Sequence, residues 1–266
     1  MAYVEVRNIG KVFLGKKHNH VIAIDDVSLN MDQGEFYCLV GPSGCGKSTL
    51  LRIMDGLIEP SRGEVLIGGK VVNQPGFDRG MVFQQFNLLP WRTVLGNVEF
   101  GLENRGVPKN ERQERAMRFI NLVGLETFAN SYPSQLSGGM QQRVGLARAL
   151  AIEPDILLMD EPFGSLDAQT REIMQGELTR IWSIEKRTVL FVTHDIEEAI
   201  FLADRVIIMS SRPGRFVDIV DVPFPRPRDN ELRSKAEFAA LRGQISNIMS
   251  RGITQEEAAA GERSEE

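Results

Sequence analysis

A glycine-rich stretch at residues 41–48 has the residue types and spacing of a loop that binds phosphate. It fits the pattern G-x-x-x-x-G-K-[ST], follows β-forming residues and precedes residues with helical apolar spacing. Glycines let backbone N–H groups turn toward phosphate oxygens, and the start of the following helix adds partial positive charge. Lys47 would reach the terminal phosphates, and the Ser48 hydroxyl would ligate Mg²⁺. The stretch therefore predicts nucleotide binding rather than a plain glycine turn, without indicating which nucleotide enzyme this is.

Two adjacent carboxylates end an apolar run at residues 156–159. Asp160 is placed to hold Mg²⁺ through water, and Glu161 to polarise an attacking water molecule. A solvated acidic turn is the alternative interpretation. His194 follows another apolar run and could donate to a γ-phosphate, although a lone histidine is more often structural. These three residues are candidates for the second half of a nucleotide site.

A pair of glycines, Gly138 and Gly139, follows Ser137 at the start of a predicted helix. Ser137 is a favourable N-cap residue, and apolar residues recur at helical spacing from Met140 onward. The glycines would clear side chains from the helix start and make a second anion site. A simple capped helix does not explain two glycines where they cost helix stability. Two phosphate-binding helix starts about 90 residues apart predict a head-to-tail pair of chains that share each nucleotide.

Short apolar runs alternate with helical stretches around these motifs, which indicates a buried parallel sheet. Strands are expected at residues 3–13, 22–31, 35–40, 64–67, 80–83, 156–159, 189–192 and 206–209, and a helix at 48–57. Helical periodicity alone runs from about 93 to 150, so an all-helical insertion of about residues 88–152 interrupts the α/β core. A linker is expected at 226–229, then one amphipathic helix, and a charged, frayed tail at 254–266.

The composition limits the possible functions. The chain has 266 residues, with 31 Lys and Arg against 36 Asp and Glu, a formal net charge of −5 and a pI of about 5.5. This balance counts against a general nucleic-acid binder. Two cysteines, Cys38 and Cys45, do not suggest a disulfide scaffold. The sequence shows neither a signal peptide nor an apolar run approaching the roughly 18 residues of a spanning helix, so we expect a soluble, cytoplasmic protein.

The ordered set of motifs resembles the nucleotide-binding subunit of an ATP-binding cassette (ABC) transporter over residues 3–225. The matching segments are residues 41–48 (Walker A), Gln84 (Q-loop), 136–141 (signature motif), 157–161 (Walker B), 165–167 (D-loop) and His194 (H-loop). The resemblance implies an α/β fold: a P-loop NTPase (RecA-like) core with an N-terminal antiparallel β subdomain and an inserted all-helical subdomain. It also implies an ATPase domain over residues 1–225, with a C-terminal helix and charged tail over 226–266.

The same resemblance assigns roles around ATP and Mg²⁺. Glu161 would be the catalytic base, and His194 would contact the γ-phosphate. Gln84 would sense the metal and the attacking water, and Lys47 would act on the terminal phosphates. Ser48, Gln84 and Asp160 would be the metal ligands. The residues expected around the nucleotide are Phe13, Gly41, Pro42, Ser43, Gly44, Cys45, Gly46, Lys47, Ser48, Thr49, Ser137, Gly138, Gly139, Gln141 and Asp167.

An aromatic residue near the N-terminus stacks on adenine in this family, and Phe13 is the candidate where many relatives carry tyrosine. The adjoining residues 14–21 leave the choice of aromatic open. They contain Lys16, Lys17, His18 and His20. Histidine spacing there could suggest a metal site, but the segment is more typical of a solvated polar loop.

Finer features resemble the ATPase subunits of nitrate, sulfonate and taurine importers, with bicarbonate or pyrimidine-precursor systems as relatives. They are residues 78–84, 88–91, 174–175 and 212–215. The implied partners are a second copy of the chain when ATP is bound, membrane permease subunits that dock near Gln84 and Trp91, and a separate solute-binding protein. No nucleic-acid partner is expected. The implied location is the cytoplasmic face of the cell membrane, as a peripheral subunit.

Two other classes of protein are less consistent with the sequence. A non-transport ABC protein that acts on DNA or ribosomes usually adds long coiled coils or a second cassette, and this chain has neither. An unrelated P-loop kinase or GTPase would leave the signature motif unexplained, and the Asn-Lys-x-Asp tetrad that reads guanine is absent. The sequence therefore favours an ATPase that drives an importer, and does not identify the transported solute.

Overall fold

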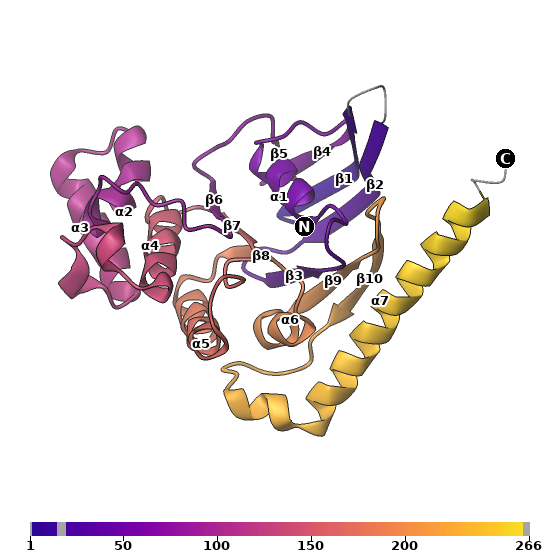
Figure 1. The fold of residues 1–266 in the computed structure, drawn as a ribbon. Coiled ribbons are helices and arrows are strands. Elements are labelled where there is room, and N and C mark those ends of the chain that lie inside the picture. The colour runs from indigo at the N-terminus through magenta and orange to yellow at the C-terminus, as the bar shows by residue number, and fades with distance from the viewer. Residues whose placement is uncertain (1, 15–19, 263–266) are drawn as a thin grey trace. The chain divides into compact units, whose positions relative to one another are not determined.

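The computed structural model describes residues 2–14 and 20–262, and it forms two compact units (Figure 1). The first unit combines Met1–Pro75 with Thr188–Glu266, and the second is Gly76–Arg187. Both mix helices and strands, so the predicted α/β class is confirmed.

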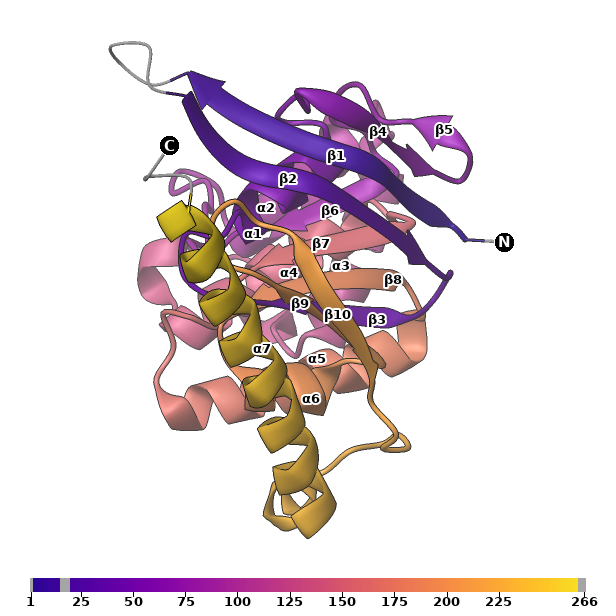
Figure 2. The same ribbon diagram turned by 90° about the vertical axis from the view of Figure 1, so that its right-hand side faces the viewer.

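An antiparallel sheet occupies the N-terminal part of the first unit. Its order is β2 (His20–Met31), β1 (Val4–Leu14), β4 (Arg62–Ile67) and β5 (Lys70–Val71). Figure 2 shows β1 and β2 side by side along their length, with Val4 opposite Met31 and Leu14 opposite His20. Alternating residues such as Val4 and Val6 are buried, as expected of a sheet with one covered face. This sheet is the predicted antiparallel β subdomain.

The remaining strands of the first unit include a parallel set. β3 (Phe36–Val40) pairs in parallel with β8 (Thr188–Thr193) on one side and with β9 (Arg205–Met209) on the other. Every residue of β3 and β8 is buried, which is typical of inner parallel strands. β10 (Phe216–Asp221) adds an antiparallel edge to β9. The helices of this part are α1 (Lys47–Asp55) and α6 (Ile196–Leu202).

The second unit contains a parallel strand pair and the predicted helical insertion. β6 (Arg79–Val82) pairs with β7 (Ile156–Asp160). Three helices lie between these strands in the chain, and they pack on one another through buried residues such as Val98 and Ile120: α2 (Val94–Asn104), α3 (Lys109–Leu122) and α4 (Gly138–Ala151). Short 3-10 turns cover Glu126–Phe128 and Pro133–Gln135, and α5 (Ala168–Glu185) follows β7.

The C-terminal part differs from the sequence-based expectation in two ways. Residues 226–229 are not a free linker, because Arg228 is buried and bound to backbone carbonyl oxygens. After a 3-10 turn at Asn230–Ser234, α7 runs from Ala236 to Glu262, so the backbone that we expected to fray from residue 254 is helical through Glu262. The tail TQEEAAAGE is rich in alanine and glutamate, which are strong helix formers, and the prediction gave its charge too much weight.

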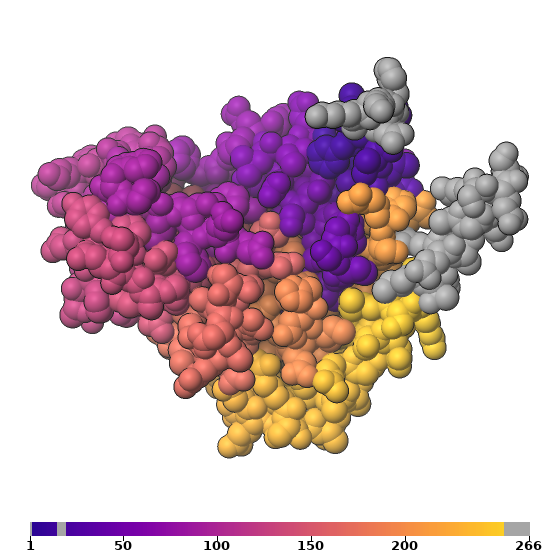
Figure 3. Space-filling model, in the orientation of Figure 1, coloured from indigo at the N-terminus to yellow at the C-terminus, as the bar shows by residue number. Residues whose placement is uncertain are grey.

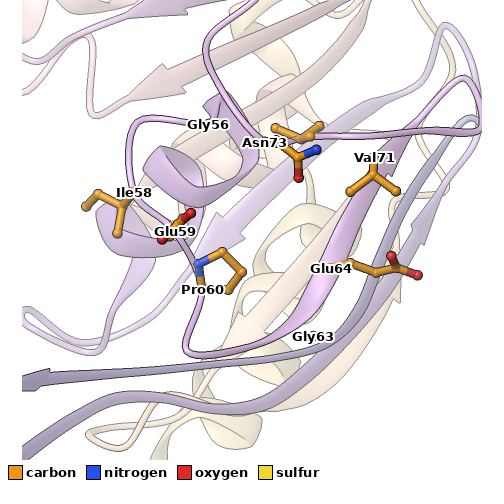
Figure 4. A pocket seen from close by; sticks show the side chains of 9 residues that line it. Gly56, Ile58, Glu59, Pro60, Gly63, Glu64, Val71 and Asn73 are labelled. Atoms are coloured by element: carbon orange, nitrogen blue, oxygen red, sulfur yellow. The ribbon is translucent and has the colours of Figure 1, made fainter.

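None of the described helices is both long enough and apolar enough to cross a membrane. A small cavity of about 220 Å³ lies in the first unit between the end of α1 and the edge of the antiparallel sheet (Figure 4). Pro60, Glu64 and Val71 line it, and Glu64 is already paired with Arg7 at 3.1 Å. This cavity contains none of the predicted site residues.

Candidate nucleotide site

The phosphate loop connects β3 to α1 in the first unit, as predicted. Gly44 and Gly46 have φ angles of 76° and 107°, in the left-handed region that favours glycine. A Cβ at Gly46 would also lie 2.8 Å from the carbonyl oxygen of Ala23, so the position has no room for a side chain. Gly46 is the N-cap of α1 and provides no side chain to bond the first-turn N–H groups. The helix start can therefore bind an anionic ligand.

Lys47 is buried, with its ammonium group held within the loop. Its Nζ donates to the carbonyl oxygens of Gly41 at 2.7 Å and Pro42 at 2.9 Å. Burial raises the pKa of the adjacent Cys45 thiol, and the positive charge of Lys47 opposes that increase. A neutral Cys45 therefore packs the loop from inside, while Lys47 places a positive charge within it.

His194 lies in a tight turn between β8 and α6, also in the first unit. The Thr193 hydroxyl accepts from the Asp195 N–H at 3.0 Å and donates to Glu198 Oε2 at 2.5 Å. Asp195 caps α6 by accepting from the N–H groups of Glu197 and Glu198. His194 itself is exposed. The bonds of Thr193 and Asp195 therefore fix the backbone on both sides of a residue whose side chain faces solvent.

Gln84 and Glu161 lie together in the second unit. β7 ends at the buried Asp160, and Glu161 follows with a φ of 44°, a left-handed value that is uncommon for a residue with a side chain. The point where Gly164 would carry a Cβ lies 3.3 Å from Gln84 Nε2 and 3.8 Å from Glu161 Oε2. Gly164 therefore lies close to both side chains, and a larger residue at this position would crowd them.

The signature segment forms the start of α4, and its glycines have a packing role that the sequence did not indicate. Ser137 is the N-cap, with its Oγ accepting from the Met140 N–H at 3.4 Å. A Cβ at Gly139 would lie 2.9 Å from Thr170 Cγ2, and one at Gly138 would lie 3.7 Å from Leu166. The pair of glycines therefore lets the start of α4 approach the start of α5, in addition to clearing a helix N-terminus.

Gln141 and Asp167 serve local structure in the second unit. Gln141 Nε2 donates to the carbonyl oxygens of Pro133 at 3.1 Å and Leu136 at 3.2 Å. Asp167 is the N-cap of α5, and its bonds from Thr170 hold the pKa of the carboxyl below its ordinary value. Both residues shape the loops around the signature and D-loop segments.

Two residues that the sequence analysis missed organise the loop after Gln84. The fully buried Asn97 accepts from the Leu89 N–H at 2.8 Å and donates to the carbonyl oxygens of Leu89, Arg92 and Thr93. Arg148 donates to the carbonyl oxygens of Phe86 and Asn87. Their partners are backbone groups, so no sequence motif marks either residue. Trp91 projects from this organised loop with 72% of its surface exposed.

Phe13 lies near the end of β1, where its ring is 39% exposed and Lys11 Nζ lies 5.2 Å from the ring centroid. An exposed ring at a strand end is suitable for stacking on a base. Lys16, Lys17 and His18 lie outside the described residues, and His20 begins β2. Within the described parts of the chain, no group of three or more His, Cys, Asp or Glu residues is suited to hold a metal ion.

These features define a class of protein. A buried parallel strand, a glycine loop with left-handed turns and a helix start without a side-chain cap form the phosphate-binding unit of a P-loop nucleotide hydrolase. A second strand that ends at Asp160 and is followed directly by Glu161 supplies the carboxylates typical of that class.

Comparisons with known proteins identify the family. Residues 24–164 match the family model described as ABC transporter. The chain is 55% identical, over 92% of its length and 91% of the relative, to an uncharacterized ABC transporter ATP-binding protein of Methanocaldococcus jannaschii. It is 44% identical to the nitrate import ATP-binding protein of Synechocystis (97% of this chain, 98% of the relative). It is 48% identical to the taurine import ATP-binding protein of Rhizobium johnstonii (90% and 93%).

A solved structure supports the same assignment. The chain matches a dimeric ATP-binding cassette in a post-hydrolysis state bound to ADP and phosphate, with a TM-score of 0.72 and 37% sequence identity. The match covers 84% of this chain and all of the chain in the solved structure. The chain belongs to the ABC transporter family. It is an ABC-type ATPase.

Proposed function

We propose that this ATPase, with Mg²⁺, drives uptake of a small solute through a separate membrane permease, from the cytoplasmic face of the cell membrane. The solute would be nitrate, a sulfonate such as taurine, bicarbonate or a related small molecule, in line with the names of the relatives. The phosphate loop carries the proposal, because its uncapped helix start and Lys47 form a site for the phosphates of a nucleotide.

Glu161 is the proposed catalytic base. It directly follows the buried Asp160, and its strained backbone conformation is of the kind that is retained at functional sites. Its carboxylate would orient and polarise the attacking water, and Gln84 beside it would bind the same water. His194 would donate to the γ-phosphate. Nearly all of the rate enhancement would come from positioning and charge stabilisation, because the reaction needs no covalent intermediate.

The proposed magnesium ligands fit the ion. Ser48 and Asp160 offer hard oxygen donors, which Mg²⁺ prefers, and Gln84 offers an amide oxygen. The ion would take its remaining ligands from phosphate and water. Bound Mg²⁺ would neutralise charge on the terminal phosphates.

The partners follow from two surfaces. The loop at residues 86–91 presents the exposed Trp91 on a backbone that Asn97 and Arg148 hold in place, which is suitable for docking a permease. The starts of α1 and α4 would act on one γ-phosphate when two chains pair head to tail with ATP between them. A separate solute-binding protein would select the solute outside the cell.

One set of measurements tests the ATPase assignment. We expect the purified chain to bind and hydrolyse Mg-ATP. Lys47→Ala should lose ATP binding, and Glu161→Gln should keep binding but lose turnover, because glutamine preserves the shape and removes the base. Phosphate release and binding of a fluorescent ATP analogue separate these effects. If Glu161→Gln kept wild-type turnover, the assignment of the base would be wrong. Reconstitution with the neighbouring permease genes, followed by uptake of labelled nitrate and taurine, tests the transport proposal.

A further inference from the structure

The helix α6 follows His194 and is too short to be stable without help. It has seven residues, well below the roughly 12–15 that an isolated helix needs in water. At its start, Asp195 caps the first turn, and the buried Glu198 accepts the hydrogen bond from Thr193. The position of His194 between Thr193 and Asp195 therefore depends on where α6 is held.

Arg228, from the segment after β10, binds the other end of α6. Its Nη1 lies 3.0 Å from the carbonyl oxygen of Ile200, 3.1 Å from that of Phe201 and 2.7 Å from that of Ala203. Its Nε and Nη2 donate to the carbonyl oxygen of Phe224. All five bonds go to backbone carbonyls, and three of them are at the end of α6, so Arg228 satisfies acceptors of the helix C-terminus and places a positive charge there. Burial lowers the pKa of Arg228 to about 10, so it is still charged at neutral pH.

Two further arginines of the same segment bind this end of α6. Arg226 donates to the carbonyl oxygen of Leu202 and, at 3.0 Å, to the carboxylate of Asp204. The guanidinium carbon of Arg233 lies 4.5 Å from the ring centroid of Phe201. Three arginines within eight residues, 226–233, therefore hold one helix end. We call Arg226, Arg228 and Arg233 the arginine clasp.

α7 continues this segment and reaches the start of α6. Phe238, Leu241 and Ile245 are buried and anchor α7 to β9 and β10, beside which it lies in Figure 2. Figure 3 shows the described part of this C-terminal segment packed against the residues that precede it in the chain. On the same helix, Arg242 pairs with Glu197 at 2.7 Å. A solvent-open hollow of about 600 Å³ is lined by His194 from one side and by Arg242 and Gly243 of α7 from the other. The C-terminal segment therefore contacts α6 at both ends and borders the hollow beside His194.

We infer that residues 222–252 hold α6 in its position, and that Arg228 is a positioning residue for His194. The inference rests on the proposed role of His194. If the clasp is loosened, α6 would shift or fray, the Thr193–Glu198 bond would weaken, and the imidazole would spend less time where it can reach a γ-phosphate. A misplacement of about 1 Å at a catalytic group can cost on the order of 100-fold in rate. ATP binding at the phosphate loop would not change, because none of the clasp residues belongs to that loop.

Two substitutions in the full-length chain test the inference. Arg228→Met removes the charge and all five bonds, whereas Arg228→Lys keeps the charge but not the fork of donors. Leu29→Ala is the control: Leu29 is buried in β2, and the cavity should destabilise the first unit without touching α6. Hydrogen exchange of residues 193–203 without nucleotide reports on α6 directly. Steady-state ATPase kinetics then separate kcat from KM.

We expect Arg228→Met to raise exchange at residues 193–203 and to lower kcat at least tenfold, with KM changed less than twofold. Arg228→Lys should lie between Arg228→Met and the wild type. Leu29→Ala should leave both the exchange of α6 and kcat near wild type despite a lower Tm. Unchanged hydrogen exchange of residues 193–203 in Arg228→Met would show that Arg228 does not hold α6 in place. Raised exchange with unchanged kcat would overturn the positioning role if His194→Ala is inactive. If His194→Ala is also active, the proposed role of His194 is itself wrong, and the inference fails with it.

Discussion

The guanidinium of Arg148 donates to the carbonyl oxygen of Phe86 across a distance of 3.1 Å, and to that of Asn87 at 2.7 Å. Arg148 lies on α4, the helix that starts at Ser137, and Phe86 lies two residues after Gln84. The Phe86 ring also approaches Gly138, at 3.8 Å from the position of a Cβ there. The signature helix and the loop after Gln84 are therefore joined at both ends of α4.

Replacing Arg148 should uncouple these two segments. Arg148→Met removes both hydrogen bonds. The exposed carbonyl of Asn87 can bind water instead, whereas the part-buried carbonyl of Phe86 loses its donor at a cost of up to about 1–3 kcal/mol. We expect the basal ATPase of the isolated chain to fall less than threefold and stimulation by the permease to be lost. Arg148→Lys, which can still bind one carbonyl, should retain part of the stimulation. A parallel loss of basal and stimulated rates in both variants would mean that Arg148 only stabilises the fold.

Trp91→Ala tests the docking surface directly. A loop as apolar as residues 86–91 would either pack as a small core or serve as a docking surface, and the 72% exposure of Trp91 excludes the core for that side chain. We expect its removal to leave Tm and soluble ATPase activity unchanged, because an exposed ring contributes little to folding. Turnover stimulated by the permease should drop at least tenfold. The matched control is Phe128→Ala, an exposed aromatic residue elsewhere in the second unit. Equal losses of soluble and stimulated activity, with intact folding, would contradict docking.

The thiols give a prediction for pH dependence. Burial raises the pKa of Cys45 above its ordinary value, so at pH 7 almost all of the thiol is protonated and unreactive. Cys45 is also buried, at 1% exposure, so its alkylation requires local opening of the phosphate loop. In a Cys38→Ser background, alkylation of Cys45 by iodoacetamide should therefore be slow at pH 7, and its rate should rise about tenfold for each pH unit below the pKa. Mg-ADP should protect it. Cys38 is fully buried, with its pKa raised further by burial, so a Cys45→Ser chain should react only on unfolding. Fast alkylation of Cys45 at pH 6 would contradict a raised pKa of its thiol.

A double substitution separates the two roles of Gly139. Gly139→Ala would gain about 1 kcal/mol of helix propensity, but its Cβ would lie 2.9 Å from Thr170 Cγ2, and such overpacking costs about 1–3 kcal/mol. The clash should outweigh the propensity, so urea denaturation should show lower stability for Gly139→Ala. Thr170→Ser removes the Cγ2 methyl and should restore stability in the double variant. If activity stays lost after stability returns, Gly139 also serves a ligand. Additive losses of stability would exclude the steric explanation.

The strands that the sequence predicted best are those with an unbroken run of apolar residues. β3, β7 and β8 are buried at every residue, and a run of apolar residues in a parallel sheet has few other interpretations. β10 was missed because most of its residues are exposed, and an edge strand needs no apolar run. Within the site, the loops follow from glycine spacing, whereas Asn97, Arg148 and Arg228 bind backbone carbonyls that only the folded chain brings near. Such contacts leave no pattern of residue types to detect.

The shared-nucleotide dimer has a direct test in Glu161→Gln. This change should preserve the shape and the Mg²⁺ environment of the site while removing the base, so ATP stays bound and the dimer accumulates. Sedimentation should show a monomer without nucleotide and a dimer with saturating Mg-ATP. Ser137→Arg should prevent dimerisation by bulk and charge at the start of α4. As a control, Ser134→Arg puts the same side chain at an exposed position just before the signature segment.

Mixing two inactive chains gives the decisive measurement. In a mixed dimer of Lys47→Ala and Ser137→Arg chains, one composite site pairs the intact Lys47 of one chain with the intact Ser137 of the other, and the second site carries both lesions. If one working site suffices, ATPase activity should return on mixing. When equal amounts of the two chains associate at random, half of the dimers are mixed and each mixed dimer has one working site of two, so the expected activity is about a quarter of the wild-type rate. If both sites must be intact for ATP to be hydrolysed, mixed dimers should still form in the presence of ATP and be detectable with differently labelled chains. Neither activity nor mixed dimers, together with a Glu161→Gln chain that stays monomeric in saturating Mg-ATP, would rule out a nucleotide shared between Lys47 and Ser137.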